Sequence, residues 1–207
     1  MKINNLPELE LLAILSAASV MRSKKYFELI LKGLLKNKCS VKKIYEALLQ
    51  TYLFAGFPST LISLKGLHEI VGDDKVYKGY DLNKYSNRGE KNCRIIYGNK
   101  YDKLIANVKS FSPEMAEWLI IEGYGKVLGR KGLTLIEREI CIISILAALK
   151  FKDQLYSHIN GAVRVKAKFD LIICTIKNLE LISAKSSADF GLKVFNEYQN
   201  KIRSNLI

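Results

Sequence analysis

Hydrophobic residues recur every three to four positions along most of the chain, which is the spacing of amphipathic α-helices. No stretch shows the sustained two-residue alternation of a half-buried strand. The pattern therefore predicts an all-α fold, a helical bundle. Helices are expected over residues 7–21, 24–36, 40–54, 59–71, 87–96, 101–109, 112–123, 134–149, 168–182 and 187–202, with one more beginning at Asp153.

The helix over residues 134–149 has the clearest start. Thr134 and Glu137 have the spacing of a capping box, in which each side chain satisfies a free backbone amide near the other. From Ile140 to Leu149 the helix is apolar almost all round, which predicts burial between other helices. This run is about half of the ~20 residues needed to cross a bilayer, so no membrane span is predicted.

The polar, tyrosine-dotted stretch 72–86 separates two helical segments and is the predicted linker. We expect an N-terminal helical repeat over residues 1–71 and a C-terminal repeat over residues 87–207. The N-terminal stretch suits an amphipathic helix better than a signal sequence, so a cytoplasmic location is expected.

The two segments resemble each other, which suggests an internal duplication. Glu10 and the apolar run after it match Glu139 and its apolar run, and each run is followed by a charged break and further helices. In this alignment Leu29 stands where the second segment has His158. Only the second repeat would then carry an acid and a base.

The net charge of +13 is spread over the whole chain. The doublets Lys24-Lys25 and Lys42-Lys43 are isolated, and basic and aromatic residues do not interleave as they do along a nucleic-acid-binding face. The lysines are therefore interpreted as a solvated surface that helps to attract a small anionic molecule. Neither nucleic acid nor membrane is an expected partner.

The four cysteines are separated by long intervals, with no CxxC pair and no histidine at metal-ligand spacing. They are Cys39, Cys93, Cys141 and Cys174. No metal and no other cofactor are predicted.

Glu139 and His158 are the candidate catalytic residues. Each shares a helix face with apolar residues, so both are expected to point into the core. His158 alone would be interpreted as a core histidine bonded to the backbone, but glutamate is seldom buried without a partner. A carboxylate and an imidazole that face one apolar space can transfer protons without a metal or cofactor.

The same region resembles the carboxymuconolactone decarboxylase family. The resemblance rests on the following residues: Tyr124-Gly125, Arg130, Gly132-Leu133, Arg138-Glu139-Ile140, Leu146 to Leu149, Gln154-Leu155 and His158. The related alkyl hydroperoxidase D branch places Cys-x-x-Cys between the glutamate and the histidine, where this chain has Phe151 and Gln154. Peroxide reduction needs a thiolate, so the missing sulfurs argue against a peroxidase.

The resemblance implies a cofactor-independent acid/base enzyme, decarboxylase- or lyase-like, for a small carboxylated or lactone substrate. Arg130 and Arg138 would then hold the substrate carboxylate, or alternatively form structural ion pairs. The family also implies a symmetric homo-oligomer, with a trimer preferred. Two alternatives stay open: an antioxidant peroxiredoxin-like protein that uses an isolated cysteine, and a non-catalytic ligand-binding or assembly protein.

Overall fold

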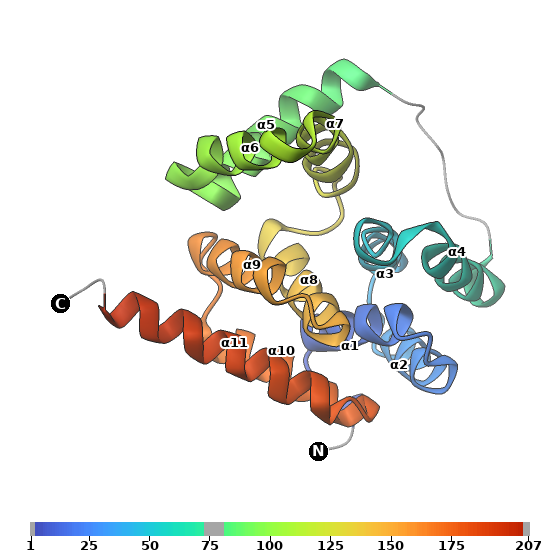
Figure 1. Cartoon of the computed structure of the whole chain (residues 1–207). Coiled ribbons are helices and arrows are strands. Elements are labelled where there is room, and N and C mark those ends of the chain that lie inside the picture. The colour runs from blue at the N-terminus through green and yellow to red at the C-terminus, as the bar shows by residue number, and fades with distance from the viewer. Residues whose placement is uncertain (1–2, 73–80, 205–207) are drawn as a thin grey trace. The chain divides into compact units, whose positions relative to one another are not determined.

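The computed structural model describes residues 3–72 and 81–204, and all regular structure in these ranges is helical (Figure 1). The predicted all-α class is confirmed. The chain divides into two compact units. Unit 1 comprises residues 1–72 and 133–207, and unit 2 comprises residues 73–132.

This division differs from the predicted one, because residues 133–207 pack with residues 1–72 instead of continuing the segment that begins at residue 87. The last part of the predicted linker 72–86 is helical. Residues 73–80 lie outside the described residues, but a helix already begins at Leu82, where Asp81 caps it by accepting from the Lys84 amide. Sequence periodicity marks helices but carries no information on which of them pack together.

Unit 1 contains two runs of helices. The first run consists of η1 (Ile3–Asn5), α1 (Glu8–Val20), α2 (Lys24–Lys36), α3 (Val41–Leu49) and α4 (Tyr52–Val71). The second run consists of α8 (Leu135–Leu149), α9 (Lys152–Arg164), α10 (Phe169–Lys177), η4 (Asn178–Ile182) and α11 (Lys185–Ser204).

The second run repeats the first with a displacement of 128 residues. Both bounds of α9 are displaced by this number from those of α2, and both bounds of α10 from those of α3. The turns repeat as well. Positive φ angles occur at Arg22 (55°) and Lys150 (60°), and again at Lys38 (60°) and Lys166 (73°). Such angles are uncommon outside glycine, so their recurrence fixes the register between the two repeats.

This register corrects the sequence alignment of the first helix by one residue. Leu11 lies eleven positions before Arg22, and Glu139 lies eleven positions before Lys150. The residue equivalent to Glu139 is therefore Leu11 and not Glu10. Sequence alone missed this shift because α1 and α8 are apolar on nearly every side, and an apolar run has no internal marker of register.

The second helix is corrected in the same way. Ile30 and His158 are each the seventh residue of their helices, α2 and α9. Ile30, and not Leu29, is therefore equivalent to His158. Ile30 is fully buried whereas Leu29 is 41% exposed, so the corrected pair also agrees in burial.

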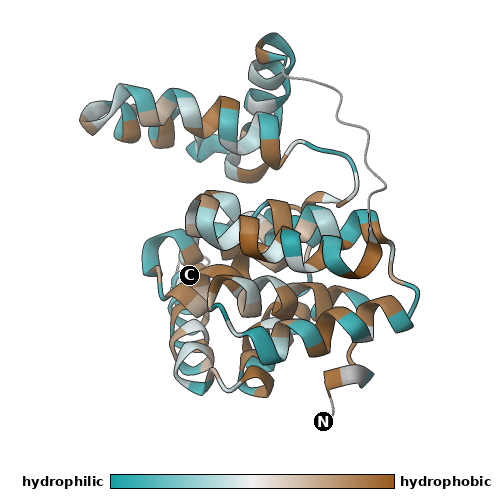
Figure 2. Ribbon diagram, turned by 90° about the vertical axis from the view of Figure 1, so that its right-hand side faces the viewer, coloured by the Kyte–Doolittle hydropathy of each residue, from teal (hydrophilic) through white to brown (hydrophobic). Residues whose placement is uncertain are grey.

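Helices α1 and α8 pack against each other at the centre of unit 1, and the residues from Leu11 to Val20 and from Arg138 to Ala147 are buried. Figure 2 shows hydrophobic residues concentrated inside this unit and hydrophilic ones on the outer sides of its helices. The two repeats also exchange polar contacts. Asn178 donates to Glu10, and Arg138 donates to Gln50; the two contacts are equivalent, because Glu10 corresponds to Arg138 and Asn178 to Gln50.

Unit 2 contains α5 (Leu82–Tyr97), η2 (Gly98–Lys100), α6 (Tyr101–Phe111), α7 (Pro113–Trp118) and the π-helical stretch η3 (Leu119–Val127). Helix α5 packs tightly on η3 through two glycines. A Cβ atom on Gly89 would lie 2.1 Å from the Ile120 carbonyl oxygen, and one on Gly125 would lie 2.1 Å from that of Tyr85. Only glycine permits this approach of the two backbones.

Candidate active site

Glu139 and His158 form a buried hydrogen-bonded pair in unit 1. The Thr134–Glu137 capping box is present as predicted and starts α8, so Glu139 falls in its second turn and points inward. His158 lies on the buried face of α9, and its Nδ1 is 2.9 Å from Glu139 Oε2. Glu139 is 2% exposed and His158 is 7% exposed. Both side chains therefore point into the core, as the sequence predicts, and they are in contact with each other.

The hydrogen bond ties the tautomer of the imidazole to the charge of Glu139. When Glu139 is ionised it can only accept, so Nδ1–H donates to it and a neutral ring then has its lone pair on Nε2. Nε2 has no hydrogen-bond partner among the described residues, and the protein does not enclose this atom completely. One ring nitrogen is thus anchored, and the other can exchange a proton.

The ring of Phe54 contacts the imidazole edge-to-face, with centroids 6.0 Å apart and planes at 80°. Phe54 belongs to the first turn of α4, which is broken two residues later at Gly56, with φ 72°. This kink separates the turn that carries Phe54 from the long part of α4. Sequence analysis missed Phe54, because nothing in the local pattern of residues 51–58 indicates a contact with a histidine more than one hundred residues away.

Arg138 is not positioned to hold a substrate. It is 1% exposed, and its Nη2 lies 3.0 Å from Glu46 Oε2, while its Nη1 donates to Gln50 Oε1 at 3.3 Å. Glu46 is 2% exposed, so this is an ion pair inside the core. Of the two predicted roles of Arg138, the structural ion pair is the one that the geometry supports. The available signal in the sequence was the spacing of Glu46 on α3 and Gln50, the C-cap of that helix, which lie four positions apart on one face.

Arg130 belongs to unit 2, whereas the Glu139–His158 pair belongs to unit 1. Its role as a substrate ligand stays a prediction.

Lys43 binds the first turn of two helices. Its Nζ lies 2.9 Å from Glu8 Oε1 and 2.6 Å from Glu137 Oε1, so it connects α1 with α8. Burial by itself raises the pKa of Glu137, but hydrogen bonds from Lys43 and Thr134 outweigh burial and lower that pKa below its usual value. The bonds to Glu137 and Glu8 raise the pKa of Lys43. This cluster holds the start of the helix that carries Glu139.

Three of the four thiols are unsuited to nucleophilic chemistry. Cys39, Cys93 and Cys141 are buried, and burial is the largest cause that raises the pKa of each to about 12. A thiol with such a pKa is almost entirely protonated near neutral pH. Cys174 is exposed.

Within residues 3–72 and 81–204, no three His, Cys, Asp or Glu side chains gather in a way that could hold a metal ion. No single helix of this part of the chain is long and apolar enough to cross a membrane. Helices α3 and α4 reach that length and composition only together, and they are bent by 119°.

A scan against protein-family models found no match, and neither a search of curated proteins nor a search of solved structures found one.

Proposed function

We propose that Glu139 and His158 form a general acid–base pair that exchanges protons with a small substrate. The observation that carries this proposal is the internal repeat. At the same two positions of the first repeat, the chain has Leu11 and Ile30, which are 1% and 0% exposed. The helical scaffold therefore accommodates an apolar pair at this place, so packing alone does not account for the acid and the base.

A structural role is the competing explanation, and energetics argue against it. Removing two polar groups from water carries a desolvation penalty, and a buried ion pair often contributes no more stability than apolar residues of similar volume. The single hydrogen bond between Glu139 and His158 adds about 1 to 3 kcal/mol against that penalty. A polar pair that gives little stability over the apolar alternative is best explained by its chemistry.

The arrangement suits a proton transfer at Nε2. The lone pair of Nε2 would accept a proton from the substrate, and the carboxylate of Glu139 would stabilise the imidazolium that forms. In the reverse direction the imidazolium would return the proton to the product. The contact with Phe54 restricts rotation of the ring, which helps to keep Nε2 in one orientation.

The reaction class comes from the resemblance to carboxymuconolactone decarboxylase. We propose a decarboxylation or isomerisation of a small carboxylated or lactone substrate, on a fold of two related halves similar to that family, in a homo-oligomer. Thiol peroxidase chemistry is disfavoured, because the resemblance places Phe151 and Gln154 at the cysteine positions and Cys39, Cys93 and Cys141 are buried thiols with raised pKa values.

The test starts with ligand discovery by the wild-type protein. A panel of small carboxylates and lactones is screened by thermal shift, and each hit is then assayed for turnover by NMR. The screen is repeated with the double variant Glu139→Leu/His158→Ile, which copies the first repeat, and with His68→Asn as the control, since His68 is the exposed second histidine.

We expect turnover by the wild-type protein and by His68→Asn, and at least a 100-fold loss of turnover in the double variant, the typical contribution of acid–base catalysis. Hits that bind without turnover would support the non-catalytic ligand-binding alternative. Turnover that survives in the double variant would contradict the proposed role of the pair.

A further inference from the structure

Unit 1 has an open groove that does not include Glu139 or His158. It lies between α2 and α4, with the end of α1 between them, and has a volume of about 580 Å³. Its apolar lining comes from Ala18, Phe27, Ile62 and Ile70. Phe27 packs closely on α4, because its Cε1 would lie only 3.1 Å from a Cβ atom on Gly66.

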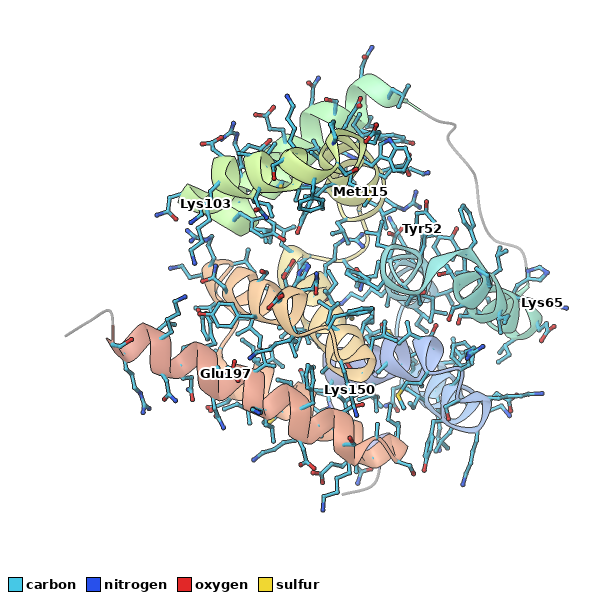
Figure 3. All side chains as sticks on the ribbon, viewed as in Figure 1. Tyr52, Lys65, Lys103, Met115, Lys150 and Glu197 are labelled. Atoms are coloured by element: carbon cyan, nitrogen blue, oxygen red, sulfur yellow. The ribbon has the colours of Figure 1, made fainter. Side chains whose placement is uncertain are left out.

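The rim of the groove is positively charged. Four basic and two acidic residues line it, namely Arg22, Lys24, Lys32, Lys65, Glu28 and Glu69. Each glutamate already has a lysine of its own helix at 3.9 Å, in the pairs Lys24–Glu28 and Lys65–Glu69. Arg22 and Lys32 form no ion pair within the described residues. In Figure 3, Lys65 extends from the outer side of α4.

The shape of the groove favours a helix over a small molecule. A small-molecule site usually encloses most of its ligand. Here Ile62 is 65% exposed and Ile70 is 45% exposed, so a small ligand would remain largely in water. Lys24 to Lys32 and Ile62 to Ile70 each span about 12 Å at ~1.5 Å per residue, which is about two helical turns. Two helical walls of this length match the groove-binding mode of an amphipathic helix.

We propose that this groove binds an acidic amphipathic helix of a partner protein. The apolar stripe of that helix would cover Phe27, Ile62 and Ile70, and carboxylates beside the stripe would pair with Arg22 and Lys32. The net charge of +13 favours the same kind of partner, since a basic protein attracts an acidic one over longer distances.

The test uses two synthetic peptides of about fourteen residues, labelled with a fluorophore and helical in solution. Both carry leucines at i, i+3, i+4 and i+7, the spacing of groove-binding helices. One has glutamate and the other has lysine at the positions beside the stripe. We expect the glutamate peptide to bind at least 10-fold more tightly at low salt, and this difference to shrink as added salt screens the charges.

Two matched pairs of variants locate the binding. Ile62→Lys should abolish binding of the glutamate peptide, whereas Leu61→Lys should not, because Leu61 is similarly exposed on α4 but does not line the groove. Lys32→Glu should weaken the binding of the glutamate peptide and strengthen the binding of the lysine peptide. Lys25→Glu is its control, since Lys25 is exposed on α2 outside the groove. Circular dichroism verifies that every variant is folded.

Equal affinity for the two peptides, or no binding of either, would overturn the proposal. So would an equal loss of binding in Ile62→Lys and Leu61→Lys. Decanoate, an amphipathic anion without a helix, completes the panel, and its binding in the groove in the absence of peptide binding would assign the site to a small molecule instead.

Discussion

The two helical repeats of unit 1 have the same register, and one buried pair of positions is apolar in the first repeat and ionisable in the second. The first repeat has Leu11 and Ile30 there, and the second has Glu139 and His158. All four side chains are at most 7% exposed. The difference shows that this position in the scaffold can be filled by hydrocarbon alone.

A second polar contact differs from the Glu139–His158 pair, because it is found in both repeats. Arg138 bonds to Gln50, and at the equivalent positions of the opposite repeats Glu10 bonds to Asn178. Here polar residues occur in both halves, as expected if the contact serves the packing of the two repeats on each other. The contact found in both repeats is thus best explained by structure, whereas the acid and the base at Glu139 and His158 face apolar counterparts in the first repeat and are best explained by function.

Leu11→Glu is expected to give the largest change in stability. Leu11→Glu would place a carboxylate at the position of Glu139 but opposite Ile30, with no base to pair with it. We expect a loss of about 3 to 5 kcal/mol in the free energy of unfolding, because an unpaired buried charge is strongly destabilising. Urea unfolding followed by circular dichroism measures this loss. Leu29→Glu is the control and should change stability by less than about 0.5 kcal/mol, since Leu29 is 41% exposed.

A change below about 1 kcal/mol for Leu11→Glu would mean that the first repeat tolerates a charge at this position. The difference between the two repeats would then no longer support a functional role for Glu139 and His158.

The structural ion pair should respond to substitution as a core contact. Arg138→Met leaves Glu46 buried without its guanidinium partner, and we expect a loss of about 3 to 4 kcal/mol of unfolding free energy. Adding Glu46→Leu should recover most of that loss, because the second substitution removes the unpaired charge. A double variant as unstable as the single one would show that Arg138 stabilises the core through other contacts.

Glu137 allows a smaller, pH-dependent test of how α8 is held. Its pKa is lowered in the folded protein, so its contribution to stability is present above its unfolded pKa near 4.5 and is lost as the pH falls through the folded value. Glu137→Gln should therefore destabilise by about 1 to 2 kcal/mol at pH 7 and by much less at pH 3. Equal destabilisation at both pH values would show that the hydrogen bonds of Lys43 and Thr134 with residue 137 do not depend on its charge.

Much of this structure follows from local signals in the sequence. The capping box at Thr134 fixed the start of α8, and the apolar period placed Glu139 and His158 on inward faces, so their contact was predictable from two neighbouring helices. The positive φ angles at Arg22 and Lys150 were not predictable, because neither residue is one of the usual turn formers. Without these angles, the alignment of the two repeats from sequence was wrong by one residue. Phe54 reaches His158 through packing of distant segments, which no local pattern encodes. For Glu46 the local spacing indicated an inward face but not its distant partner Arg138.

The central claim is that Glu139 and His158 are retained for chemistry and not for stability. The most direct test is the free energy of unfolding of Glu139→Leu/His158→Ile, measured by urea titration against the wild-type protein. The account predicts a value within about 1 kcal/mol of wild type, or higher, because the double variant reproduces the apolar pair of the first repeat. A loss of more than about 3 kcal/mol would show that the second repeat depends on the pair for its fold, and would contradict the account.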